Sequence, residues 1–172
     1  MSEPSLLSRA LYRGPSHETL HERYAKRGVI DTSAPVRAVS GIHVAAPPEA
    51  VWARLSALPR WPEWVPGVAY VRLGPSGVAP DAAFRWKLNG TRIRSTLAVV
   101  DPGRELCWTG LLAGTRAVHR FRLQESGGGT EVESEESIGG PFVALYFGSE
   151  KLQRVLESWL TALKTTTEAS PS

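Results

Sequence analysis

The sequence is poor in the features that would immediately assign it to a class. It has one cysteine, Cys107, among 172 residues, so an internal disulfide framework is excluded. Its 20 lysines and arginines are nearly balanced by 17 aspartates and glutamates. Nucleic-acid binding needs a concentrated basic face, which so small an excess does not favour. We therefore expect no nucleic-acid partner.

Long apolar runs are also missing. The longest, Phe142 to Phe147, is far too short to span a bilayer. The first four residues, Met-Ser-Glu-Pro, lack the basic and apolar stretches of a secretory signal. A single thiol fits a reducing compartment. Together these observations predict a soluble, cytoplasmic protein with no stable membrane insertion.

What the sequence does contain is tryptophan, six residues in a chain of moderate length. A chain of this size can bury roughly 70% of its unfolded surface, so one domain needs no disulfide or metal to hold its core. Large aromatic side chains that packing does not require commonly line concave apolar sites. The composition therefore favours a small-molecule cavity.

Residues 115–138 predict a β-hairpin, because two alternating runs flank three consecutive glycines that can supply the positive φ of a tight turn. Suppose Leu123 faces Val132 on the apolar side of this pair. The period of two along a strand then places His119 directly opposite Glu136 on the same side.

The outward face of this hairpin supports the same register. It sets Arg122 against Glu133 and Arg120 against Glu135, and opposite charges across a strand pair contribute about 0.2–1 kcal/mol each. The imidazole and the carboxylate on the apolar side then need an explanation, since unpaired ionisable groups are costly to bury. Either they satisfy each other, or they face a cavity.

Residues from Val68 onward predict an antiparallel meander of strands. Asn89-Gly90 is a strong two-residue hairpin signal and pairs Trp86 with Ile93. Turns expected at 101–104 and near 112–113 give the further pairs Val99–Leu106 and Trp108–Ala117. The pattern then places one set of side chains on a concave face: Phe84, Trp86, Ile93, Ser95, Leu97, Val99, Leu106, Trp108, His119, Phe121, Val132 and Glu136.

The opposite face of the same strands carries four basic residues, Arg85, Lys87, Arg92 and Arg94. They form either an ordinary solvated face or a patch for a partner. Cys107 neighbours Trp108 along the strand and therefore points away from the concave face, which favours a packed thiol over a nucleophile.

The amino-terminal part, residues 1–38, predicts an arm of short helices that packs on the domain or frays. It contains His17-Glu18-Thr19-Leu20-His21, which matches the spacing of a zinc-protease motif. No third ligand follows on a helix, so we expect a solvated helix face. The alternatives open for this arm are closing the pocket, forming a homodimer contact or hanging free.

The first strand is expected over 39–45. Pro47 and Pro48 then suit the start of a helix, which Pro59 closes, and the following segment 60–67 carries two tryptophans. At the other end of the chain, Phe142 to about Thr167 predicts a long amphipathic helix, interrupted at Gly148. Its apolar stripe comprises Leu145, Leu152, Val155, Leu156, Trp159 and Leu163. Residues 168–172 are expected to be a disordered tail.

Six stretches resemble the START-related (SRPBCC) superfamily, specifically its bacterial polyketide cyclase/dehydrase-like branch: Ile42 to Trp52, Leu58 to Gly67, Leu106 to Gly110, Gly114 to Phe121, Gly128 to Glu136 and Leu156 to Lys164. The resemblance covers about residues 39–167. It implies an α+β helix-grip fold, in which a curved antiparallel β-sheet wraps around a long C-terminal α-helix, with two short helices after the first strand. It also implies a deep apolar cavity between sheet and helix.

Combined with the inward set, the resemblance gives the candidate site. The expected ligand-binding residues are Trp61, Trp64, Phe84, Trp86, Ile93, Ser95, Leu97, Leu106, Trp108, Phe121, Ser134, Tyr146, Leu152 and Trp159. His119 and Glu136 form the candidate acid/base pair. They supply only two ligand groups, so we expect no metal, and the sequence has no phosphate loop or dinucleotide fingerprint that would indicate an organic cofactor.

Three functions remain open. The first is non-covalent binding of a hydrophobic small molecule, lipid-like or ring-containing. The second is a polyketide aromatase/cyclase-like reaction in which His119, oriented by Glu136, moves a proton. The third is a protein-interaction module that uses the four basic residues of the outer face.

Overall fold

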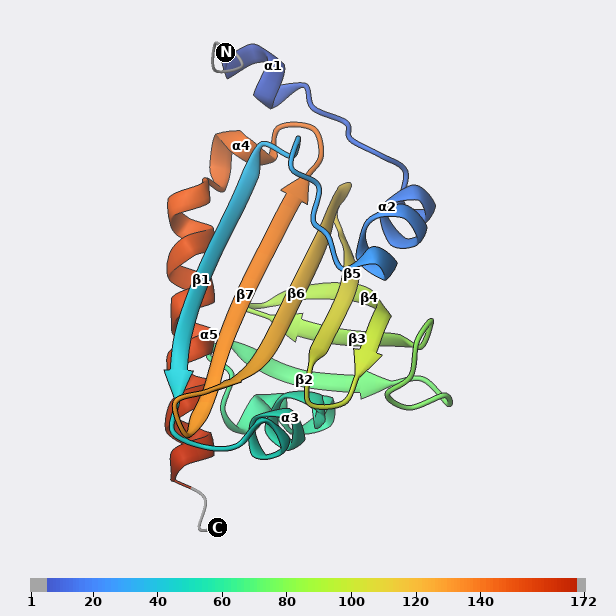
Figure 1. The fold of residues 1–172 in the computed structure, drawn as a ribbon. Helices are drawn as coiled ribbons and strands as arrows, with labels where there is room; N and C mark the ends of the chain where they lie inside the picture. Colours follow the sequence, from blue (N-terminus) through green and yellow to red (C-terminus); the bar gives the residue numbers. More distant parts are fainter. Residues whose placement is uncertain (1–5, 170–172) are drawn as a thin grey trace.

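The fold is built on one antiparallel sheet, and the computed structural model describes residues 6–169. The strands lie in the order β1-β7-β6-β5-β4-β3-β2, so the first strand pairs with the last (Figure 1). The strand bounds are β1 Val36–Val44, β2 Val68–Leu73, β3 Ala83–Leu88, β4 Thr91–Asp101, β5 Glu105–Leu112, β6 Thr115–Ser126 and β7 Gly129–Gly139.

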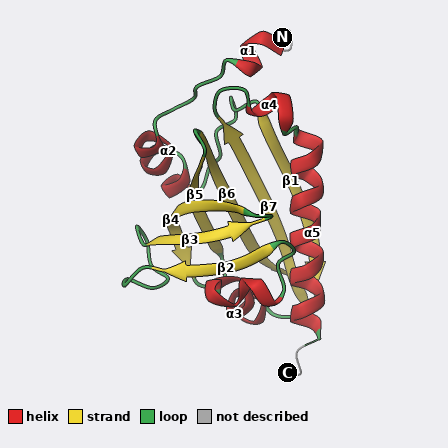
Figure 2. Ribbon diagram, turned by 180° about the vertical axis from the view of Figure 1, so that it is seen from behind, coloured by secondary structure: helices red, strands yellow, loops and turns green. Residues whose placement is uncertain are grey.

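Helices cover both faces of this sheet. The long helix α5 runs along β1 and β7 on the concave face, whereas α2 and η1 lie on the outer face (Figures 1 and 2). The helix bounds are α1 Leu6–Ala10, α2 His17–Arg23, η1 Ala25–Arg27, α3 Pro48–Ser56, η2 Leu58–Glu63, α4 Val143–Tyr146 and α5 Ser149–Glu168. The predicted helix-grip fold, including the two short helices after the first strand, is confirmed.

Several boundaries differ from the sequence prediction. Strand β1 begins at Val36 instead of 39. The long helix is indeed interrupted at Gly148, which caps α5, but the separate turn α4 leaves Leu145 66% exposed, outside the buried stripe. Helix α5 includes Glu168, whose carboxylate accepts a hydrogen bond from the Ala45 amide at 2.7 Å. Residues 170–172 of the predicted disordered tail lie outside the described residues.

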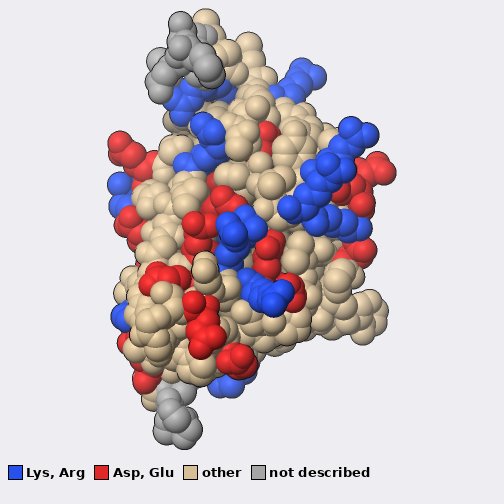
Figure 3. Space-filling model, in the orientation of Figure 1, with Lys and Arg blue, Asp and Glu red and all other residues tan. Residues whose placement is uncertain are grey.

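The register of the central hairpin is as predicted. His119 is opposite Glu136, and Arg120 is opposite Glu135. The Arg120 guanidinium contacts two carboxylates, donating to Glu135 at 2.8 Å and to Glu105 at 3.0 Å, so it ties β5, β6 and β7 together. This network lies on the outer face, where Figure 3 shows acidic and basic side chains interspersed.

Two predicted pairings are wrong. A bulge between Leu97 and Val99 sets Val99 opposite Cys107, so Val99 packs on the outer face. The β5–β6 turn is formed by Ala113 and Gly114, both at positive φ, one position later than expected. Trp108 therefore pairs with His119 instead of Ala117. The resulting shift is two residues, which keeps every side chain of β6 on its predicted face.

The amino-terminal segment packs against the outer face of the sheet. Leu20, Ala25 and Ile30 are buried against Cys107 and Val118. Burial raises the pKa of the Cys107 thiol, which disfavours the reactive thiolate form. This segment forms a second, smaller core on the side opposite α5.

The prediction that the histidine motif forms a solvated helix face is wrong for its second histidine. His21 is buried because α2 lies directly on the sheet, with its Nδ1 3.0 Å from the Thr109 hydroxyl and its Nε2 3.0 Å from Asp81. Asp81 and Glu22 both hold the Lys26 ammonium, at 2.8 and 2.9 Å. A cation from the chain itself thus occupies the space between these carboxylates.

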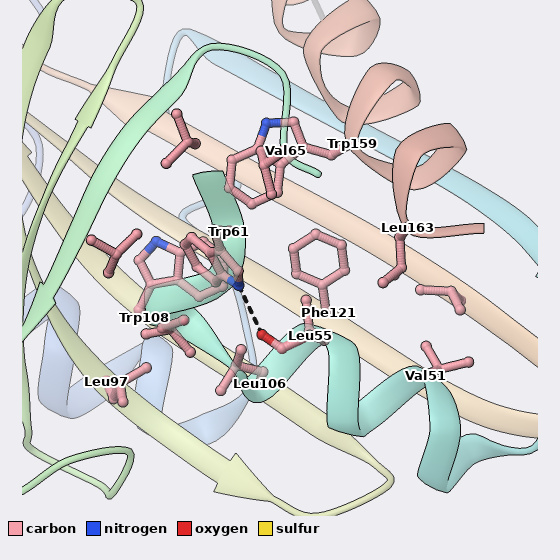
Figure 4. Packing of buried hydrophobic residues seen from close by; sticks show 14 of the residues in the cluster. Val51, Leu55, Trp61, Val65, Leu97, Leu106, Trp108, Phe121, Trp159 and Leu163 are labelled. Carbon is pink, nitrogen blue, oxygen red and sulfur yellow. Dashed lines mark hydrogen bonds between the residues drawn. The ribbon is translucent and has the colours of Figure 1, made fainter. Parts of the chain in front are cut away.

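The main core fills the half of the concave face that is covered by α3 and η2. Figure 4 shows Trp61 among Trp108, Phe121 and Trp159, with its indole N–H donating to the Leu55 carbonyl at 2.9 Å. The ring centroid of Trp61 lies 5.4 Å from that of Trp108 and 5.3 Å from that of Trp159. Aromatic pairs at such separations contribute about 0.5–1.5 kcal/mol beyond their buried area.

The contact between the amino-terminal segment and the charged network can be tested at Gly28. This residue has φ +62°, and an added Cβ would lie 2.7 Å from Glu105 Oε1 and 3.1 Å from Arg120 Nη2. Gly28→Ala should lower the free energy of unfolding, measured in urea, by at least about 2 kcal/mol, because backbone strain and displacement of the ion pair add.

Gly77→Ala is the matched control. Gly77 has φ +65°, but an added Cβ meets nothing within 4 Å, so only the backbone cost of about 1 kcal/mol applies. Equal losses in the two variants would show that the segment does not press on the Arg120 network.

Candidate functional site

An apolar cavity of about 380 Å³ lies between the concave face of the sheet and helices α4 and α5. Its size is within the range of small-molecule sites. Strands β3 to β7 supply one wall with Trp86, Leu88, Ile93, Ser95, Trp108, Gly110, Leu112, Thr115, Ala117, His119, Glu136 and Ile138, while Asn89 and Thr91 come from the β3–β4 hairpin tip. The helical side supplies Val143, Tyr146, Phe147, Lys151, Leu152, Val155 and Trp159. Larger hollows, of about 430, 840 and 1040 Å³, lie elsewhere on the surface and are more open.

His119 forms part of the inner wall and is only 4% exposed. Its ring lies 4.5 Å from the ring of Trp108, 4.9 Å from Phe121 and 5.5 Å from Trp159. Nε2 is 2.9 Å from the Ser134 hydroxyl. Burial lowers the pKa of His119 to about 3, so the imidazole is neutral at neutral pH.

Glu136 is the polar neighbour of this ring. Its Oε2 lies 3.4 Å from His119 Nδ1, which is longer than a good hydrogen bond. Burial raises the pKa of Glu136 to about 8, so the carboxyl group is protonated at neutral pH and can donate a hydrogen bond. Its side chain keeps 15% exposure and lines the cavity. The inner wall therefore presents an uncharged acid next to an uncharged imidazole.

A protein-family model described as polyketide cyclase/dehydrase and lipid transport matches residues 35–168. The chain belongs to this family. The match agrees with the predicted SRPBCC polyketide cyclase/dehydrase-like branch, and it spans the whole sheet and α5. No curated protein sequence matches the chain.

Solved structures show the same fold. A protein of Mesorhizobium loti is 21% identical, with a TM-score of 0.64 over 79% of this chain and 99% of that chain. A protein of Chromobacterium violaceum is 12% identical, with a TM-score of 0.64 and the same coverage of 79% and 99%. The di-domain ARO/CYC BexL, from the BE-7585A biosynthetic pathway, is 20% identical, with a TM-score of 0.62 over 78% of this chain and 50% of BexL. None of the helices between residues 6 and 169 combines the length and the apolar composition that a bilayer-spanning helix needs.

Half of the residues expected to bind a ligand line the cavity of this family member: Trp86, Ile93, Ser95, Trp108, Tyr146, Leu152 and Trp159. The other seven lie outside its lining. Trp61, Phe84, Leu97, Leu106 and Phe121 belong to the main core, with Trp64 partly buried against it, and Ser134 is buried beneath His119. The aromatic cluster around Trp61 fills the space that these side chains were expected to leave open.

Two small residues of the cavity wall were not among the expected ligand-binding residues, although the hairpin register places Ala117 on the inward face. Gly110 and Ala117 are paired across β5 and β6, and both line the cavity. A Cβ added to Gly110 would lie 3.6 Å from the Ser95 hydroxyl oxygen and 3.9 Å from the Ala117 Cβ, so the missing side chain leaves room for a ligand. The sequence signal for this position was a glycine inside an otherwise regular strand, which commonly marks a place where a ligand or another backbone segment approaches the strand closely.

The four basic residues lie on the outer face of β3 and β4. Arg85 is opposite Arg94 and Lys87 is opposite Arg92, an arrangement in which like charges repel. A role for this face in binding a partner stays a prediction.

The two neutral groups of the inner wall predict a specific pH dependence of stability. Between pH 4.5 and 8 the folded state keeps the Glu136 proton that the unfolded state has lost, so the free energy of unfolding falls as pH rises through this window. For His119 the corresponding window is pH 3 to 6.5, where the imidazole is protonated in the unfolded state and neutral in the folded state. The free energy of unfolding therefore falls as pH drops through this window.

Glu136→Gln should therefore remove the alkaline decline and keep the acidic one. Urea unfolding at pH 5.5 and pH 8 should show that wild type loses at least about 1 kcal/mol more than the variant between the two, since one pKa unit corresponds to ~1.4 kcal/mol. Parallel pH profiles for the two proteins would mean that Glu136 is ionised in the folded state.

Proposed function

We propose that this protein binds one small hydrophobic molecule in the cavity between its sheet and α5. The observation that carries the proposal is the cavity wall itself. Three indole rings, those of Trp86, Trp108 and Trp159, surround a space whose only deep ionisable groups among the described residues are Glu136 and His119. Such a wall favours an apolar body with one or two hydrogen-bonding atoms.

The state of the polar pair supports binding over acid/base catalysis by the histidine. A general base must be accessible to the proton that it removes, and its pKa should lie near the working pH. The His119 ring is enclosed by aromatic rings, one nitrogen is engaged with Ser134, and its pKa is held far below neutrality. Its proposed role is to pack the wall and position Glu136.

A cyclase- or dehydratase-like reaction on a polyketide is the second candidate, and Glu136 favours it. A protonated carboxyl group with a pKa of about 8 can donate a proton to a carbonyl or hydroxyl oxygen near neutral pH. The family description and the likeness to BexL support this candidate. If this candidate is right, the Glu136→Gln variant should bind a poly-β-keto substrate with normal affinity but no longer convert it. If the wild-type protein binds the substrate without converting it, only the first candidate remains.

The cavity can be filled by mutation without disturbing the core. Gly110→Val should weaken binding of the uncharged fluorescent probe N-phenyl-1-naphthylamine at least about tenfold, or ~1.4 kcal/mol, because the new methyl groups occupy ligand space. Gly110 does not have a positive φ, and valine suits a strand, so the fold should persist. Fluorescence titration measures the affinity, and circular dichroism verifies the fold.

Gly41→Val is the control for this substitution. Gly41 lies in β1, exposed, and an added Cβ would meet only the Val132 carbonyl oxygen at 3.6 Å. This variant should bind the probe like wild type. Equal affinity in all three proteins would place the probe outside the cavity and contradict the proposal.

A further inference from the structure

A lysine at the mouth of the cavity has no counter-ion among residues 6–169. Lys151 belongs to the first turns of α5 and lines the cavity together with Phe147. Its ammonium lies 5.2 Å from the centre of the Phe147 ring, a cation–π contact. No carboxylate within residues 6–169 lies within salt-bridge distance of it, although other lysines such as Lys26 and Lys164 have such partners.

Lys151 is also the only lysine or arginine among the described residues that line the cavity. The inner wall has no cation, since His119 and Glu136 are both held in their uncharged forms by burial. An anionic group bound at that depth would be buried without an opposite charge, which is costly. A ligand that carries a negative charge must therefore keep it at the mouth.

The helix sets the distance between the two ends of the site. Lys151, Val155 and Trp159 follow one another at intervals of four residues, and all three line the cavity. Eight residues of α-helix correspond to about 12 Å along its axis. Trp159 packs against His119 at the inner end, with 5.5 Å between the ring centroids. The distance between the Lys151 ammonium and the uncharged pair of His119 and Glu136 therefore matches the length of a small elongated molecule.

We propose that the ligand is an elongated amphipathic organic anion. Its charged group pairs with Lys151 at the mouth, its apolar body lies between the indole rings, and its inner end meets Glu136. The inner end carries a hydrogen-bond acceptor, because the Glu136 carboxyl group lines the cavity with part of its side chain exposed and can donate a hydrogen bond there. This inference rests on the proposed function of the same cavity.

Two probes that differ in one charged group test the inference. They are 1-anilinonaphthalene-8-sulfonate and its uncharged counterpart N-phenyl-1-naphthylamine, titrated by fluorescence into wild type and Lys151→Met. The substitution should weaken binding of the sulfonate about three- to fivefold and change that of the uncharged probe by less than about twofold, as expected for a partly exposed ion pair. The effect on the sulfonate should shrink in high salt.

Two further variants complete the test. Lys151→Arg should restore the affinity for the sulfonate, and Lys87→Met, on the outer face of β3, should leave both affinities unchanged. If Lys151→Met weakens both probes equally or neither, the assignment of Lys151 is overturned while the cavity stands. If wild type binds neither probe, the proposed function fails first, and the inference with it.

Discussion

The contact between Trp61 and Trp159 divides the space between the concave face of the sheet and the helices that cover it. Their ring centroids lie 5.3 Å apart, one ring coming from η2 and the other from the middle of α5. On one side of the contact, the aromatic and aliphatic side chains of the main core pack against one another. On the other side, Trp159 becomes a wall of the cavity. One pair of indoles thus closes the core and bounds the site.

The chemistry of the site follows from the same enclosure. Because aromatic rings surround His119 and exclude water, the imidazole and the neighbouring carboxyl of Glu136 are both held uncharged. Two neutral groups can remain at the wall of an apolar space without the cost of an unpaired charge. The site is accordingly apolar and hydrogen-bonding at depth, and among the described lining residues only Lys151, at the mouth, carries a positive charge.

Alternation along the strands was sufficient to predict which side of the sheet is concave and that His119 faces Glu136. The misplaced turn at Ala113 still left each side chain of β6 on its predicted face, because it shifted the pairing register by two residues. The bulge before Val99 could not be predicted, since no local pattern marks the extra residue. Nor could the sequence show that Trp61 fills one half of the grip, because that depends on how η2 docks against β2 and α5.

The proposed function requires that the cavity hold one small hydrophobic molecule. Native mass spectrometry of the purified protein, incubated with a saturating amount of N-phenyl-1-naphthylamine, tests it most directly. We expect a shift by the mass of one probe molecule, and at lower probe concentrations a smaller bound fraction when Gly110 is replaced by valine. A spectrum that shows only the unliganded mass, or a ladder of adducts that is the same in both proteins, would contradict it.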